Sequence, residues 1–419
     1  MESFHYLLDI AIILLFTKAF GIFSKKLRMP SVVGALIAGI VLGPSMLGIV
    51  EPSSLITSLS EIGVIVIMFS AGLETSITDL KKAGGKAFII ALLGVLVPLA
   101  FGYAIGMMYN VGPSAWLENL FLGVILTATS VGITVETLKE MKCMSTESGN
   151  TILAAAVIDD VLGIIALTLV TGMADSSVNV MVVLLKILGF FVFAGVVGVI
   201  MHKVFAWWFD HDPNNGLQRY SIVSFAFALI MAYCSEEFFG VADITGSFVA
   251  GLIISGTSQC SYVTKRIGTL SYMLITPIFF ASIGLKLSPI AFTWQTLLLI
   301  LILCVVAVLS KVIGCGAGAL MTGYSKKQSL RIGCGMISRG EVALIVANKG
   351  MAMNLLPEFF VTPMLLCVVF TTVITPVFLK LVYKKTPDDP DFTDFHDEAA
   401  EQREIMEVME NPMTNMDVQ

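Results

Sequence analysis

Charged residues are scarce in this sequence. Only 13% of the 419 residues are charged, whereas 56% are hydrophobic, and a soluble globular protein carries roughly 25% charged residues. This scarcity excludes a soluble globular protein, and the mean hydropathy of +0.89 agrees with that conclusion. The apolar runs are about 20 residues long with turn-like breaks between them, so they predict membrane-spanning helices and not barrel strands.

Cysteine, histidine and catalytic motifs are also scarce. The seven cysteines form no CxxC pair, and there are only four histidines, so we expect neither a disulfide framework nor a metal cluster. No nucleophile motif, metal-ligand spacing or cofactor loop is present, which predicts a protein that is not an enzyme and holds no cofactor. The first apolar run, roughly 6–23, precedes the charges Lys25, Lys26 and Arg28. A retained first helix is therefore expected, not a secretory signal.

Hydropathy predicts thirteen membrane spans. Their approximate ranges are 5–24, 30–48, 56–73, 86–109, 117–137, 147–172, 179–206, 219–236, 240–257, 268–285, 292–322, 328–349 and 358–383. About eighteen Lys and Arg residues fall in one set of alternate loops and about two in the other. Because positive residues accumulate in cytoplasmic loops, this asymmetry predicts an outer N-terminus and a cytoplasmic C-terminus at the plasma membrane.

The odd number of spans predicts two inverted repeats joined by the seventh span. This symmetry relates the fifth span to the twelfth and the fourth to the eleventh. In the second span, Ala35, Gly39 and Gly43 form a stripe of small residues that predicts close helix packing. We expect a membrane domain over 1–385, followed by a tail over 386–419 with eleven acids and one base.

Two adjacent carboxylates, Asp159 and Asp160, lie near the middle of the sixth span. A central Asp costs roughly 3 kcal/mol on membrane-insertion scales, so such residues face a water-filled cavity or a partner charge and usually mark an ion or proton path. Lys311 lies deep in the eleventh span. We expect it to pair with Asp159 or Asp160, because a lysine far from the interface cannot reach water.

Hydroxyl-bearing residues interrupt the fifth span at Thr127, Thr129, Ser130 and Thr134. They are open to two interpretations. Ser and Thr can simply pack between membrane helices. Alternatively, the helix breaks here, and its freed carbonyl and hydroxyl oxygens bind a small hard cation.

Arg339 and Glu341 interrupt the twelfth span. Residues two apart cannot face each other on a regular helix, but a break near Gly340 would let both point inward. A purely structural ion pair remains an equal alternative. Glu74 lies at the cytoplasmic end of the third span. Its position slightly favours an ordinary interfacial helix end over a functional role.

Taken together and in this order, the motifs resemble the monovalent cation:proton antiporters, most closely the second-branch, NapA-type bacterial sodium/proton antiporters. They are Gly72-Leu-Glu74, Thr127–Gly132, Asp159-Asp160, Thr276–Phe280 with Gly284, Lys311 and Ser338–Glu341. The likeness runs from about residue 5 to 383. It implies a homodimeric elevator transporter, in which a core of about 86–172 and 292–383 with crossed broken helices moves against a dimerising scaffold of about 5–73 and 179–285.

The resemblance also implies residue roles. Asp160 looks like the main cation and proton carrier, and Asp159 like the partner of Lys311. Thr129 and Ser130 resemble the ligands in the broken helix, and Glu341 resembles a core acid of the opposing one. Arg339, Thr127 and Glu74 are expected to play supporting parts.

Two features distinguish the chain from the Kef-type potassium-efflux relatives. Those relatives have Gln-Asp where this chain has Asp159-Asp160, and they carry a C-terminal nucleotide-binding domain. The acidic tail here is too short for such a domain, so we expect no nucleotide gating within this chain.

The expected activity is electrogenic exchange of a monovalent cation for protons. Sodium is the first candidate, with potassium or lithium also open, because sequence does not show the size of the site. A potassium/proton antiporter is the main alternative, and a sodium-coupled solute symporter a more remote one. A channel or an inert membrane sensor is expected still less.

Overall fold

The computed structural model describes residues 4–26, 29–75, 77–109, 115–174, 180–211, 217–286, 294–384 and 391, and the regular structure among them is helical. Sixteen α-helices and one π-helical turn (η1) follow one another. They are α1 (His5–Lys26), α2 (Ser31–Leu42), α3 (Ser54–Leu73), α4 (Ile77–Tyr109), α5 (Ala115–Thr127), α6 (Val131–Glu140), α7 (Glu147–Ala174), α8 (Val180–His211), α9 (Leu217–Phe239), α10 (Asp243–Ser255), α11 (Cys260–Leu270), η1 (Ser271–Ile275), α12 (Thr276–Leu285), α13 (Trp294–Met321), α14 (Lys326–Gly335), α15 (Glu341–Ala352) and α16 (Glu358–Val382).

The helices confirm the predicted all-helical membrane fold. Among the described residues, ten single or broken helices are long and apolar enough to cross a membrane. The shorter apolar helices α2 and α10 and the broken pair α14/α15 account for the remaining predicted spans. The acidic tail over 386–419 lies outside the described residues, apart from Asp391.

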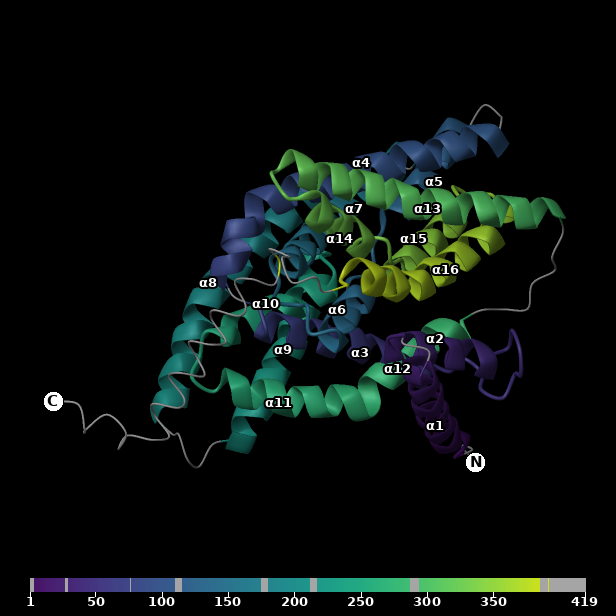
Figure 1. Cartoon of the computed structure of the whole chain (residues 1–419). Coiled ribbons are helices and arrows are strands. Elements are labelled where there is room, and N and C mark those ends of the chain that lie inside the picture. The colour runs from purple at the N-terminus through teal and green to yellow at the C-terminus, as the bar shows by residue number, and fades with distance from the viewer. Residues whose placement is uncertain are drawn as a thin grey trace.

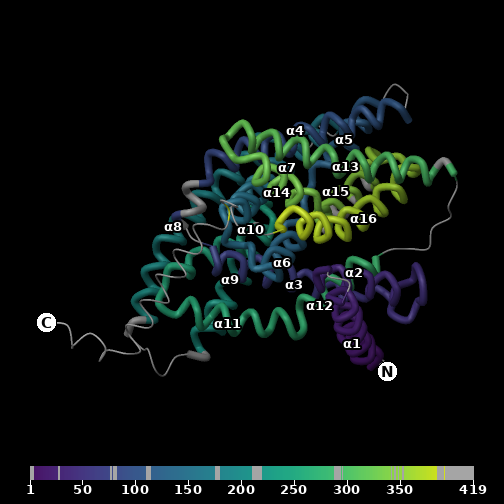
Figure 2. Tube along the Cα trace, in the orientation of Figure 1, coloured from purple at the N-terminus to yellow at the C-terminus, as the bar shows by residue number. Residues whose placement is uncertain are grey.

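The helices pack in two groups (Figure 1). In the upper part of the view, α4, α5, α7, α13, α14 and α16 pack mainly against one another, together with α6 and α15. In the lower part, α1, α2, α3, α9, α10 and α12 do the same, with α8 and α11 beside them. Figure 2 follows the chain from purple α1–α3 in the lower group to the green and yellow α13–α16 in the upper one. Contacts between the groups run mainly from α2 and α3 to α6, from α7 to α8, and from α2 to α16.

Glycine allows the closest helix contacts in the lower group. A Cβ on Gly39 of α2 would lie 2.1 Å from the carbonyl oxygen of Ala281 in α12. A Cβ on Gly72 of α3 would lie 2.2 Å from the carbonyl oxygen of Phe248 in α10. Only a residue without a side chain permits such approaches, so the predicted role of the second-span glycines in close packing is confirmed at Gly39.

The broken helix α5/α6 lies at the centre of the protein. Of its most apolar stretch, 89% is buried, compared with 22% for α1 and 11% for α8. The exposed apolar side chains of α8 include Leu185, Leu188 and Val192. Helices that are apolar but exposed belong at the lipid-facing surface of a membrane protein. The fold therefore places the hydroxyl-rich fifth span in the interior of the bundle, away from the exposed apolar surface.

Candidate functional site

Two broken helices cross near the middle of the bundle. The chain leaves helical geometry between α5 and α6, and again between α14 and α15. At the crossing, the Ser130 amide donates to the Ser338 carbonyl oxygen (2.8 Å), and the Ser338 hydroxyl donates to the Ser130 carbonyl oxygen (2.7 Å). The Thr134 hydroxyl donates to the Gly335 carbonyl oxygen (2.7 Å). These bonds satisfy backbone groups that the breaks release, a requirement for irregular structure at membrane depth, and they confirm both predicted breaks.

Arg339 is fully buried at this crossing. Its guanidinium donates to the carbonyl oxygens of Leu126 (2.7 and 3.3 Å), Ala307 (3.1 Å) and Ile337 (3.0 Å). Leu126 lies in the last turn of α5, where a positive charge interacts favourably with the helix dipole and with carbonyl groups that lack an intrahelical partner. The side chain therefore holds the break of α5 against α13.

Asp159 and Lys311 form a buried ion pair. The Lys311 ammonium lies 3.0 and 3.2 Å from the two Asp159 carboxylate oxygens. Lys311 is completely buried, and Asp159 is 2% exposed. The nearby Thr129 hydroxyl donates to the Thr127 carbonyl oxygen (3.5 Å). Of the two partners that the sequence offered for Lys311, the structure shows Asp159.

Asp160 lies beside this pair in the wall of a cavity of about 720 Å³. Asp159, Thr127 and Thr129 line the same cavity. The cavity reaches the exposed residues Glu236, Lys286 and Lys349, which belong to the loops predicted to lie outside the cell. The cavity thus connects one end of the bundle with the two carboxylates.

Three predicted site residues lie elsewhere or are not described. Ser130 does not line the cavity: its buried hydroxyl faces Gly340 and has no hydrogen-bond partner among the described residues. Glu74 ends α3 and forms an ion pair with Lys139 (3.2 Å), away from the cavity. Glu341 begins α15, but its side chain lies outside the described part of the structure.

The lower helix group supplies cavity residues that the sequence did not reveal. Glu61 of α3 and Asp243 of α10 line the same cavity as the carboxylate pair. Neither acid is predicted from the sequence to belong to the site. One acid per apolar span is a weak signal, because it does not show which way the helix face points.

Comparison with known proteins places the chain in a family. The family profile described as "Sodium/hydrogen exchanger, transmembrane" matches residues 11–385. The Na(+)/H(+)-K(+) antiporter GerN of Bacillus cereus is 40% identical over 91% of this chain and 97% of its own length. The Na(+)/H(+) antiporter of Enterococcus hirae is 37% identical over 86% of this chain and 94% of its own.

A solved structure shares the fold. The sodium proton antiporter MjNhaP1 from Methanocaldococcus jannaschii superposes with a TM-score of 0.69, covering 92% of this chain and 99% of that one at 18% identity. At this identity the likeness is evidence for the fold alone. The family itself comprises membrane transporters and not enzymes. With the profile covering nearly the whole membrane domain, this chain belongs to the transmembrane sodium/hydrogen exchanger family.

Proposed function

We propose that this protein exchanges a monovalent cation, in the first place sodium, for protons across the cytoplasmic membrane, as a NapA-type antiporter of the second branch. One observation carries the proposal: Asp160 lies in the wall of a solvent-reaching cavity next to the buried Asp159–Lys311 pair. The relatives named as Na(+)/H(+) antiporters support it.

The cavity wall offers the oxygen ligands that a hard cation prefers. Asp160 supplies a carboxylate, and Thr127 and Thr129 supply hydroxyl and backbone oxygens at the break after α5. Burial disfavours a charged carboxylate, so an unoccupied site tends to take up a proton. Proton and cation then compete for the same oxygens. Exchange follows if the loaded site crosses the membrane and the empty, charged site does not.

Lys311 offers a second proton. A cation that attracts the Asp159 carboxylate weakens its pairing with the ammonium group, and a buried lysine without its partner releases a proton readily. Two protons per monovalent cation make the exchange electrogenic. The membrane potential then contributes about 2.3 kcal/mol per 100 mV for the net charge moved.

The two helix groups suggest the moving parts. We assign the upper group, about 86–172 and 292–383, as the transporting core and the lower group, about 5–73 and 179–285, as the scaffold of a homodimer. With the N-terminus outside, the cavity opens outward. At the other end, α6 is tied to the scaffold: Glu140 accepts hydrogen bonds from the Ser31 amide (2.7 and 2.9 Å) and hydroxyl (2.7 Å), and Lys139 contacts Ser70 and Glu74. In an elevator cycle these ties break when the core moves inward.

Proton flux in reconstituted vesicles tests the proposal, with sodium, potassium and lithium supplied in turn and with an imposed voltage. Asp160→Asn should abolish cation-driven proton flux, because the amide neither titrates nor carries the charge that holds the ion. Asp9→Asn, a carboxylate on α1 outside the cavity, should leave it unchanged. Robust flux in the Asp160→Asn protein would disprove the assigned carrier, and flux that ignores voltage would disprove electrogenic exchange.

Potassium is a second candidate cation. The Bacillus cereus relative is named a Na(+)/H(+)-K(+) antiporter, so a potassium gradient should also be tested as a driving force or counter-ion. Potassium-driven proton flux with no response to sodium would favour the potassium/proton alternative.

A further inference from the structure

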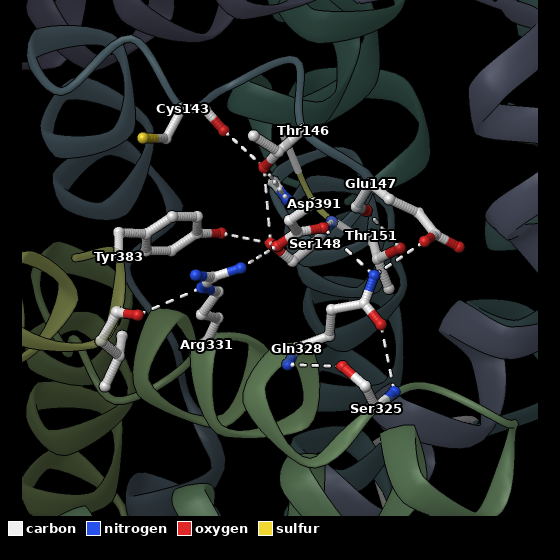
Figure 3. A network of polar contacts seen from close by, with 12 residues as sticks. Cys143, Thr146, Glu147, Ser148, Thr151, Ser325, Gln328, Arg331, Tyr383 and Asp391 are labelled. Carbon is white, nitrogen blue, oxygen red and sulfur yellow. Dashed lines mark hydrogen bonds and ion pairs between the residues drawn. The ribbon is translucent and has the colours of Figure 1, made fainter. Parts of the chain in front are cut away.

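A second buried polar site lies at the end of the bundle opposite the cavity mouth. Figure 3 shows the Asp391 side chain among residues of α7 and α14, with Tyr383 beside it. Asp391 belongs to the acidic tail by sequence, yet it is only 3% exposed. A segment with eleven acids and one base is expected to stay in water, so burial of one of its acids needs a physical reason.

Four hydrogen-bond donors converge on this carboxylate. The Arg331 guanidinium donates at 2.7 Å, the Ser148 amide at 3.1 Å and the Gln328 amide at 3.2 Å. The Ser148 hydroxyl donates as well, and it also contacts the Tyr383 hydroxyl (2.8 Å). A carboxylate with several donors and a guanidinium is the arrangement that compensates burial of a negative charge.

The receiving pocket is itself held in place. Arg331 is 1% exposed and donates a further bond to the Val382 carbonyl oxygen at the end of α16 (3.1 Å). Gln328 forms a capping box with Ser325 at the start of α14 and donates to Glu147 (2.8 Å). Without Asp391, the buried Arg331 would lose a carboxylate partner at 2.7 Å, and breaking a buried ion pair is costly.

The pocket joins the two helices that build the cation site. Ser148 lies in the first turn of α7, and the same helix carries Asp159 and Asp160 about 17 Å further along its axis. Arg331 and Gln328 lie on α14, which ends at the crossing where Ser338 meets Ser130. A rigid helix transmits a shift at one end to the other, so the relative position of α7 and α14 at this pocket sets that of the carboxylates and the crossing.

We propose that Asp391 is a positioning residue of the transporter: by docking in this pocket, the tail fixes α7 against α14 and thereby sets the geometry of the cation site. The effect on cation affinity rests on the proposed function, whereas docking does not. Because the hydrogen bonds of Asp391 described above join two helices of the core, α7 and α14, its release should alter cation affinity.

Docking is tested by hydrogen–deuterium exchange on the full chain. Asp391→Asn places an amide NH₂ or a neutral oxygen against the Arg331 guanidinium, and Asp391→Ala removes every acceptor. Loss of a charge-assisted bond should speed exchange at the Ser148 amide by about 10- to 100-fold. Asp394→Asn changes the charge of the tail equally and should leave that amide as in the wild type. Unchanged exchange in both Asp391 variants would overturn the docking.

Positioning is tested by the half-saturating cation concentration, measured in vesicle flux and, independently of transport, by cation-dependent thermal stabilisation. We expect Asp391→Asn to raise the half-saturating cation concentration about fivefold or more, while the maximal flux per folded protein is retained. A merely structural role would lower the amount of folded protein and leave this concentration unchanged, which would overturn positioning even if docking holds. If the wild type shows no cation-driven flux, the proposed function fails, and the exchange and stabilisation data still decide this proposal.

Discussion

Removal of the buried ammonium group at Lys311 should destabilise the protein strongly. In Lys311→Gln, Asp159 loses a partner that lies 3.0 and 3.2 Å from its two oxygens, in a place where both side chains are at most 2% exposed. Breaking a buried ion pair by removing one partner costs about 3–5 kcal/mol. We expect a cost at the lower end of this range, about 3 kcal/mol. Asp159 also lines the cavity, where it can take up a proton and so avoid an unpaired buried charge.

A double-mutant cycle isolates this interaction. Unfolding is followed in mixed micelles of increasing denaturing-detergent fraction for the wild type, Asp159→Asn, Lys311→Gln and the double variant. The double variant leaves no unpaired charge, so it should recover at least about 1.5 kcal/mol relative to the sum of the single losses. Lys26→Gln, on an exposed lysine, should stay within about 0.5 kcal/mol of the wild type. Strictly additive losses would refute the view that the two charges stabilise each other.

Two further predictions concern helix contacts. Gly39→Ala should lower the free energy of unfolding by about 1–3 kcal/mol, because its Cβ would meet the backbone of α12. Gly195→Ala, with open space around the new Cβ, should raise the free energy of unfolding by about 0.5–1 kcal/mol. Equal stability of the two variants in thermal unfolding would contradict the packing argument. Glu140→Gln should weaken the tie between α6 and α2, so that the Ser31 amide exchanges about tenfold faster, while Glu51→Gln should not change it. If the Ser31 amide exchanged equally fast in the Glu140→Gln and Glu51→Gln proteins, Glu140 would not be what holds α6 against α2.

The sequence by itself determined the fold class. Long apolar runs with almost no charge can satisfy their backbone groups in lipid only as helices, and this constraint acts span by span, without tertiary information. The helix breaks were also predictable, because hydroxyl residues at Thr127–Ser130 and the Arg339–Glu341 pair fit poorly on regular apolar helices. The unusual cost of charge in a membrane singled out Asp159, Asp160 and Lys311 for the same reason.

Only the tertiary structure decided which of these residues meet. Whether Lys311 pairs with Asp159 or Asp160 depends on helix rotation, and a difference of one residue turns a side chain by about 100° around the axis. Ser130 is predicted as a ligand from its hydroxyl and from the family resemblance, but in the structure its hydroxyl faces Gly340, in the break between α14 and α15.

The burial of Asp391 gave no local signal at all. In the sequence it is one acid among eleven in a polar tail, and only the convergence of Arg331, Gln328 and Ser148 from two distant helices creates a place for it. Chemistry that a single span must satisfy can be read from sequence, whereas sites shared between helices depend on how those helices pack.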